Sequence, residues 1–300
     1  MNTLTTFALV ACCALIQPAV ARGSEASSRD LSFTSSDGSV LSATISWPAQ
    51  ASARAPAVVL LHDGGPEDRD ETIGPNKIFA QIAEALNSAG FAVLRYDKRA
   101  IGKSTSKTPI SNVVRQNYLD DAEAAVDAVA SDSHVDPQRL YLLGHSEGGE
   151  LALGVALSGA KVRGLVLLAP LPLSYQAIIE AQLARQDQSP AVVSQLRLAE
   201  RLPFIKSYAR VNPPAEIAAV EQPVLVVHGS KDVQITDADI APLVEAGKKK
   251  SNFTDIELAP DNHLFFALTG DEVSTGQEYL QSHPLDPALM QAVVGWLRAH

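Results

Sequence analysis

The sequence is poor in cysteine. Only Cys12 and Cys13 are present, side by side near the start of the chain. The chain beyond them has no thiol, which excludes disulfides, cysteine-based zinc sites and a cysteine nucleophile there. The spacing H-E-x-x-H is missing as well, and the histidines and acidic residues follow no other metal-ligand spacing. We therefore expect no metal site.

Positive charge is also scarce. The 24 lysines and arginines are outnumbered by 34 aspartates and glutamates, so the formal net charge is −10. Nucleic acids are bound largely through positive charge, and this balance therefore argues against a nucleic-acid partner. The stretch "IGKST" at 101–105 is similar to the end of a P-loop. However, Asp97 stands where that motif needs its first glycine.

Long hydrophobic runs are lacking outside the N-terminal segment, so we expect no stable membrane insertion. The N-terminal segment has no Lys, Arg, Asp or Glu before Arg22, and an apolar run from Phe7 to Ile16 precedes an A-x-A pattern ending at Ala21. This pattern predicts a signal peptide over residues 1–21, cleaved after Ala21, and a periplasmic or secreted product. A short buried helix or strand is the alternative. A lipoprotein box at Cys12 is less favoured, because the apolar stretch before it is short.

What remains is an ordinary globular composition, 46% hydrophobic, in a chain of 300 residues. Residues 31–47 alternate apolar and polar around "DG", which predicts an antiparallel hairpin. Nearly continuous apolar runs predict buried parallel strands at 55–62, 90–97, 139–145, 162–170 and 222–229. Helical patterns lie at 77–89, 117–131, 147–158 and 237–249, with a last strand at 252–259 and a closing helix at 286–298. This order predicts one α/β domain over 22–300, with a doubly wound, mostly parallel sheet.

Residues 171–220 interrupt the alternation. They follow a predicted strand, have a helical pattern and are much longer than a normal crossover. In doubly wound sheets ligands bind at the carboxyl ends of the strands. We therefore interpret this segment as a helical lid over a site at that edge, with a long connection as the alternative.

The pentapeptide "GHSEG" at 144–148 is the only G-x-S-x-G in the chain. Chance alone produces such a pentapeptide in a material fraction of proteins. The predicted elements on either side of it therefore decide whether Ser146 is a candidate nucleophile. Here a predicted strand precedes Ser146 and a predicted helix follows it, which is the arrangement of a nucleophile elbow. Small neighbours permit the strained turn that exposes the hydroxyl. Ser146 is therefore the candidate nucleophile.

A serine nucleophile needs a base, and the base needs an orienting acid. Asp232 comes shortly after a predicted strand, where a carboxylate can reach an imidazole, and is the candidate acid. His263, in "APDNHLFF" after the last strand, is the candidate base. His283 is the alternative base, and His62, His145 and His228 are interpreted as structural because they end strands.

The oxyanion of acyl transfer needs two preorganised amides. The backbone N–H of Glu147, directly after the serine, is the first candidate donor. The second is the backbone N–H of Gly64 in "HDGGP", where a glycine turn is the alternative interpretation. We expect the side chain of Glu147 to lie in the first turn of the helix without a catalytic role.

Taken together, the chain resembles the α/β-hydrolases, and within them the bacterial serine esterases related to dienelactone hydrolase. The segments that carry the resemblance are "HDGGPEDRD" (62–70), "LRYDKRAIGKST" (94–105), "GHSEGGELA" (144–152), "VLVVHGSKDVQ" (224–234) and "NHLF" (262–265). The resemblance implies Ser146, Asp232 and His263 as the triad, and hydrolysis of carboxyl esters without a cofactor. "EDRD" is expected to form a salt-bridged loop.

The chain departs from this family at two positions. Asp63 stands in place of the first glycine of H-G-x-G-P, and Ala100 in place of the glycine of R-G-x-G-x-S. Asp63 brings a carboxylate close to the oxyanion loop, which we expect to disfavour anionic substrates or to shift the pH optimum.

We therefore predict a secreted serine hydrolase that cleaves small-molecule esters of small to medium acyl groups, and we favour a monomer. A thioesterase, a peptidase and a lactone or β-lactam hydrolase use the same triad and stay open as alternatives. A non-catalytic binding module on a hydrolase scaffold is the alternative from another class.

Overall fold

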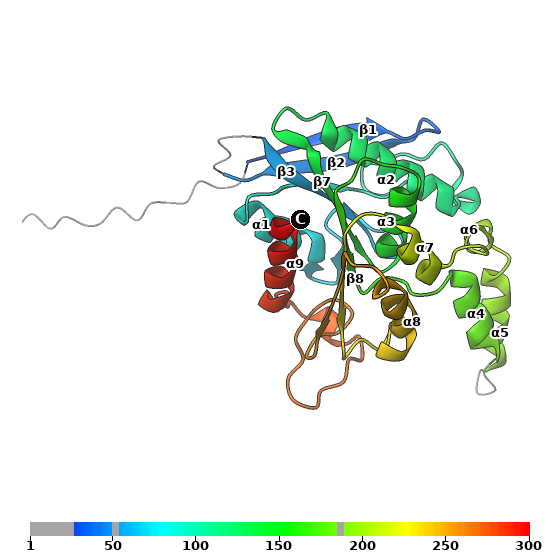
Figure 1. Cartoon of the computed structure of the whole chain (residues 1–300). Coiled ribbons are helices and arrows are strands. Elements are labelled where there is room, and N and C mark those ends of the chain that lie inside the picture. The colour runs from blue at the N-terminus through cyan, green and yellow to red at the C-terminus, as the bar shows by residue number, and fades with distance from the viewer. Residues whose placement is uncertain (1–26, 50–53, 185–188) are drawn as a thin grey trace, which may run out of the picture.

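The computed structural model describes residues 27–49, 54–184 and 189–300. The predicted signal peptide at 1–21 lies outside these residues. Figure 1 shows a central sheet with helices on both of its faces. The sheet has eight strands in the order β1-β2-β6-β3-β7-β8-β9-β10. The predicted α/β-hydrolase type of sheet, mostly parallel with an antiparallel N-terminal hairpin, is thereby confirmed.

The elements follow the predicted order closely. The strands are β1 Ser27–Thr34, β2 Val40–Trp47, β3 Ala55–Leu61, β6 Ala92–Tyr96, β7 Val135–His145, β8 Gly164–Leu168, β9 Val224–Gly229 and β10 Phe253–Leu258, with a separate pair β4 Thr72–Ile73 and β5 Asn76–Lys77. The helices outside 171–220 are α1 Ile78–Ser88, α2 Arg115–Ala130, α3 Glu147–Leu157, α8 Asp237–Gly247 and α9 Pro287–Ala299, with short 3₁₀ turns at Ile110–Asn112 and Glu278–Leu280.

The sheet separates two hydrophobic cores. On one face, alternate strand residues pack against α2, α3 and α8, through side chains such as Leu119, Leu151 and Leu243. On the other face, the remaining strand residues pack against α1 and α9, through Phe79 and Trp296 among others. Both faces of the parallel strands are covered, which explains why their sequences are nearly continuous apolar runs.

One prediction was too short. β7 begins at Val135 rather than 139 and contains Pro137. Proline lacks the N–H that a central strand needs, so the sequence argues against a strand at that point. The register between β3 and β7 shifts between Ala55 and Ala57. Between Val135 and Leu140 β7 advances five residues while β3 advances two, so Pro137 lies in a bulge of β7, where a missing ladder donor is tolerated.

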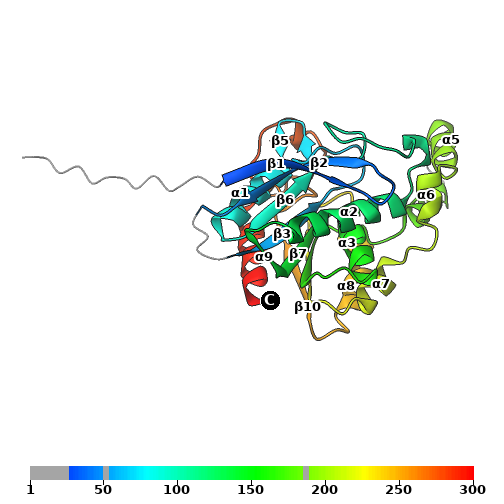
Figure 2. The same cartoon turned by 90° about the horizontal axis from the view of Figure 1, so that it is seen from above.

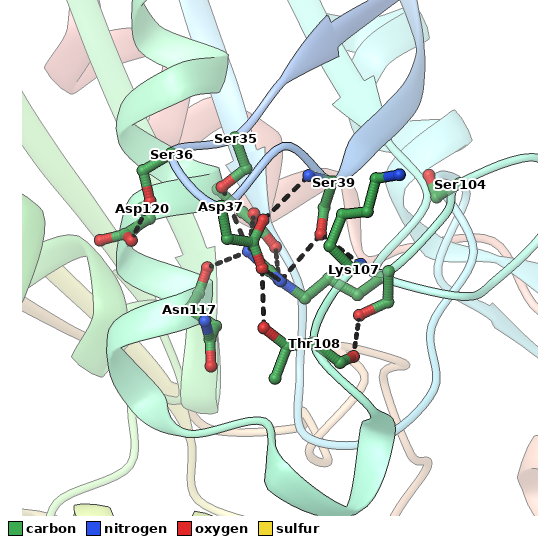
Figure 3. Close-up of polar contacts among 12 residues, drawn as sticks. Ser35, Ser36, Asp37, Ser39, Ser104, Lys107, Thr108, Asn117 and Asp120 are labelled. Atoms are coloured by element: carbon green, nitrogen blue, oxygen red, sulfur yellow. Dashed lines mark hydrogen bonds and ion pairs between the residues drawn. The ribbon is translucent and has the colours of Figure 1, made fainter.

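The hairpin is tied to the body of the protein by a polar network (Figure 3). The buried guanidinium of Arg99 donates to Asp37 in the hairpin turn at 2.6 Å and to Asp121 in α2 at 2.6 Å. Asp37 also accepts from Thr108 at 2.8 Å. These contacts hold the segment after β6 in place, which matters because that segment lines the candidate site.

The described residues of 171–220 form four helices, α4 Tyr175–Ala184, α5 Pro190–Ala199, α6 Pro203–Ser207 and α7 Pro213–Ala219. The last three have proline in the first turn, where its missing N–H and fixed φ cost nothing. Figure 2 shows β1, β2, β6, β3 and β7 side by side, with α5 and α6 beyond the edge of the sheet. In the described part of the chain, no helix is long and apolar enough to cross a membrane.

Candidate active site

The turn between β7 and α3 is strained. Ser146 has φ +51° and ψ −112°, a backbone conformation that non-glycine residues rarely adopt. A Cβ on Gly144 would lie 2.0 Å from the carbonyl oxygen of Gly148, and one on Gly148 would lie 2.0 Å from that of Leu61. Gly144 is therefore required for the tightness of the turn itself, and Gly148 for the close approach of the turn to β3. The prediction of a strand–turn–helix elbow at Ser146 matches this geometry.

The structure brings Asp232 and His263 together. Asp232 Oδ2 accepts a hydrogen bond from His263 Nδ1 at 2.6 Å, and both side chains are buried. Asp232 Oδ1 accepts from the backbone amides of Gln234 at 2.7 Å and Ile235 at 2.9 Å. Because Nδ1 is the donor in this contact, Nε2 keeps the lone pair. The alternative base, His283, instead stacks on Phe266, with ring centroids 5.1 Å apart.

A second acid–histidine pair lies behind His263, and the sequence did not reveal it. His145 Nδ1 bonds to Glu71, and His145 Nε2 bonds to the backbone oxygen of His263 at 3.0 Å. The rings of the two histidines are 4.9 Å apart. His145 is structural, as interpreted, but its structural task is to hold the backbone of the candidate base. Glu71 itself is fully buried and has φ +49°.

The loop before Glu71 is a salt-bridged structure, as expected for "EDRD". Arg69 Nε and Nη2 bond both oxygens of Asp97, at 3.0 and 2.8 Å. Asp70 pairs with Arg95 and, at 3.1 Å, with Lys77. These ion pairs anchor the loop to the end of β6 and so position Glu71 beside His145.

The Glu71–His145 pair makes stability depend on pH. Burial opposes the charge of His145, but the Glu71 carboxylate outweighs it and raises the pKa of His145 to about 9, from 6.5. A histidine with a raised pKa contributes stability that is fully present below the unfolded pKa and is lost as the pH rises through the folded one. Below pH 6.5 this contribution is about 3 kcal/mol.

We expect Glu71→Gln to lower the free energy of unfolding by about 3 kcal/mol below pH 6.5 and by much less above pH 9. Urea unfolding of both proteins at several pH values measures this. Glu84→Gln, at an exposed position on α1, is the matched control and should change little. A cost that does not vary with pH would contradict the prediction.

The side chain of Glu147 has a larger role than the sequence indicated. It is fully buried, and its Oε2 accepts from Lys98 Nζ at 3.1 Å. Its Oε1 accepts from the hydroxyl of Tyr208, which follows α6, at 2.6 Å. Lys98 Nζ also donates to the backbone oxygen of Asp63 at 2.7 Å. The residue after the serine thus connects three segments: the loop after β3, the segment after β6 and the helical insertion.

The two candidate oxyanion donors differ in their surroundings. The amide of Glu147 begins α3, so no earlier carbonyl within the helix accepts from it. The amide of Gly64 donates to the carboxylate Oδ1 of Asp63, at 2.5 Å. A Cβ on Gly64 would lie 2.5 Å from the hydroxyl of Tyr175 in α4. Glycine is therefore needed where the insertion approaches this loop.

A cavity of about 360 Å³ adjoins the site. It lies between the loop after β3, the segment after β6 and the insertion, and is lined by Gly65, Pro66, Lys98, Tyr118, Glu147 and Phe204 among others. The rings of Tyr175, Phe204 and Tyr208 contact one another with centroids 5.0 to 5.6 Å apart. The cavity volume falls at the lower end of the usual range for small-molecule sites. Across the described residues, no group of three or more His, Cys, Asp or Glu side chains is arranged to hold a metal ion.

The sheet order and the strand–turn–helix at Ser146 correspond to the α/β-hydrolase fold. A family model described as serine aminopeptidase, S33, matches residues 75–211. Esterase EstD of Thermotoga maritima is 31% identical over 261 residues, which are 81% of this chain and 62% of EstD. The chain thus spans less than two thirds of that relative.

Two further comparisons agree with this class. Thiohydrolase aneE of Aspergillus aculeatus is 28% identical over 172 residues, covering 57% of this chain and 49% of aneE. Among solved structures, esterase Pf2001 of Pyrococcus furiosus superposes with a TM-score of 0.66 at 18% identity, over 91% of each chain. The solved structure shows that the chain has the α/β-hydrolase fold.

Proposed function

We infer that this protein is a serine hydrolase that cleaves carboxyl esters of small to medium acyl groups through an acyl-Ser146 intermediate. The observation that carries the inference is the buried Asp232–His263 pair, which leaves Nε2 of the histidine as a base at the same edge of the sheet as the strained Ser146 elbow. The similarity to EstD supports an ester as the substrate class, and the volume of the adjoining cavity supports an acyl group of small to medium size.

In this mechanism His263 Nε2 takes the proton of the Ser146 hydroxyl as Oγ attacks the ester carbonyl. The amides of Glu147 and Gly64 receive the oxyanion. The protonated His263 then gives its proton to the leaving alcohol. A water molecule, deprotonated by the same nitrogen, attacks the acyl-serine, and that nitrogen returns the proton to Ser146 Oγ as the acid is released. Asp232 keeps the imidazole in the required tautomer throughout.

A thioester is the second candidate substrate, favoured by the similarity to a thiohydrolase. Hydrolysis of an oxygen ester and a sulfur ester of the same acyl group, measured side by side, decides between them.

For the cellular location, the charge-free N-terminus and the Ala21 pattern support export to the periplasm or the medium. We further propose that residues 171–220 act as a lid and that the protein is a monomer.

The assignment predicts covalent labelling. A fluorophosphonate should react with one residue per chain, Ser146, identified by peptide mass spectrometry. Because the base activates the hydroxyl, His263→Ala should slow the labelling by about 10²-fold or more. Heat-denatured protein is the control and should not react. Labelling at another residue, or none in the folded protein, would refute the triad and would favour a binding module instead.

A further inference from the structure

The Asp63 carboxylate contacts one of the two candidate oxyanion donors. Its Oδ1 accepts the amide of Gly64 at 2.5 Å. The hydroxyl of Ser146 is among the groups that hold the pKa of Asp63 below its usual value, so the carboxylate also lies close to the candidate nucleophile. In the mechanism above, the Gly64 amide binds the oxyanion and Ser146 is the nucleophile. A single side chain thus engages the first group and lies near the second, at the position where related enzymes have a glycine.

We propose that the Asp63 carboxylate fills the oxyanion site of the free enzyme and must be displaced by the substrate, which makes Asp63 a specificity-determining residue. The substrate class it selects is the neutral ester, and esters with an anionic group next to the reacting carbonyl are rejected. The proposal rests on the serine-esterase function given above.

The displacement is confined to the side chain. Lys98 Nζ, itself paired with Glu147, holds the backbone oxygen of Asp63 at 2.7 Å. Gly64 is closed in by the hydroxyl of Tyr175. The loop therefore stays in place, and rotation of the Asp63 side chain is the movement that frees the Gly64 amide.

The charge of Asp63 explains the selectivity. Burial opposes ionisation, but His145, His263, the Ser146 hydroxyl and the Gly64 amide together outweigh it and hold the pKa of Asp63 below its usual value. Asp63 is therefore an anion at neutral pH. A second anion beside the reacting carbonyl, and the oxyanion itself, are repelled by it across a short, partly desolvated distance. A neutral ester meets only the cost of displacing the carboxylate.

Two variants separate the effect of filling the oxyanion site from the effect of the negative charge of Asp63. Asp63→Gly empties the site and restores the glycine of the related enzymes. Asp63→Asn keeps an oxygen able to accept the Gly64 amide but removes the charge. Hydrogen bonds to charged groups are the stronger ones, so the second-order rate of phosphonylation by a neutral fluorophosphonate should rise about 10- to 100-fold in Asp63→Gly. Asp63→Asn should react at an intermediate rate.

A matched pair of substrates tests the selectivity. Dimethyl malonate is neutral, whereas monomethyl malonate carries a carboxylate on the carbon next to the ester carbonyl. We expect the wild type to discriminate against the monoester, and both variants to reduce that discrimination by about tenfold or more. Acid release is followed in a pH-stat, and circular dichroism verifies that each variant is folded.

The outcomes are distinct. If the wild type and both variants are phosphonylated at equal rates, or the variants react more slowly, Asp63 does not occupy the oxyanion site and the inference is wrong, while the esterase assignment stands. If the ratio of the hydrolysis rates of the two malonates is the same in the wild type and in both variants, the proposed selectivity is wrong. If no form is labelled at Ser146, the proposed function and the inference both fail.

Discussion

Ser146→Ala is expected to abolish ester hydrolysis while leaving the fold intact. The alanine has no hydroxyl to form the acyl intermediate, and removal of a serine nucleophile typically lowers kcat by about 10³- to 10⁶-fold. Hydrolysis of 4-nitrophenyl butyrate, followed by the release of nitrophenolate, measures the loss. The oxyanion amides and the cavity are unchanged, so the effect should fall on kcat rather than on KM.

The matched control is Ser46→Ala. Ser46 is also a buried serine, but it lies in β2, which β6 and β3 separate from β7. Its variant should keep normal activity. Circular dichroism and urea unfolding of both variants establish that they are folded. Full activity in Ser146→Ala would exclude the acyl-serine mechanism.

Lys98→Met is expected to produce the largest loss of stability. Lys98 and Glu147 form a buried ion pair at 3.1 Å, with side chains only 4% and 1% exposed. Although burial opposes the charge of Lys98, Glu147 holds its pKa above the usual value. Without the ammonium, Glu147 is left as a buried anion, and such a loss costs about 3–5 kcal/mol. The free energy of urea unfolding at neutral pH measures it.

Two further variants control this experiment. Adding Glu147→Gln to Lys98→Met removes the uncompensated charge, so the double variant should be more stable than Lys98→Met alone. Lys248→Met breaks an ion pair with Glu245 whose side chains are both more than half exposed, and it should cost about 1 kcal/mol or less. Equal losses in Lys98→Met and Lys248→Met would contradict the buried-pair argument.

Most of the fold was predictable because its signals are local in the sequence. A strand buried on both faces needs a continuous apolar run. Each of the five predicted runs forms a parallel strand in the structure, namely β3, β6, β7, β8 and β9. The start of β7 at Val135 was missed because Pro137 is locally unfavourable in a strand. The structure places Pro137 in a bulge of β7, where five residues of β7 stand against two of β3. The sequence shows the proline but not the pairing that forms the bulge.

The contact between Asp232 and His263, two residues of the candidate triad, was predictable for a similar reason. Its residues follow the ends of separate strands, and the topology brings those strand ends to one edge of the sheet. Asp232 and His263 do meet there, at 2.6 Å. The choice of His263 over His283 followed from its place directly after the last strand.

The sequence by itself determined the class of fold, the strained serine turn and the order of the candidate catalytic residues, because each depends on short patterns and on the order of the elements. Only the tertiary structure decided what surrounds them. Glu71 and His145 are 74 positions apart, and Lys98 and Glu147 are 49 apart. Such buried charges find partners according to how distant segments pack, and no local pattern records that packing.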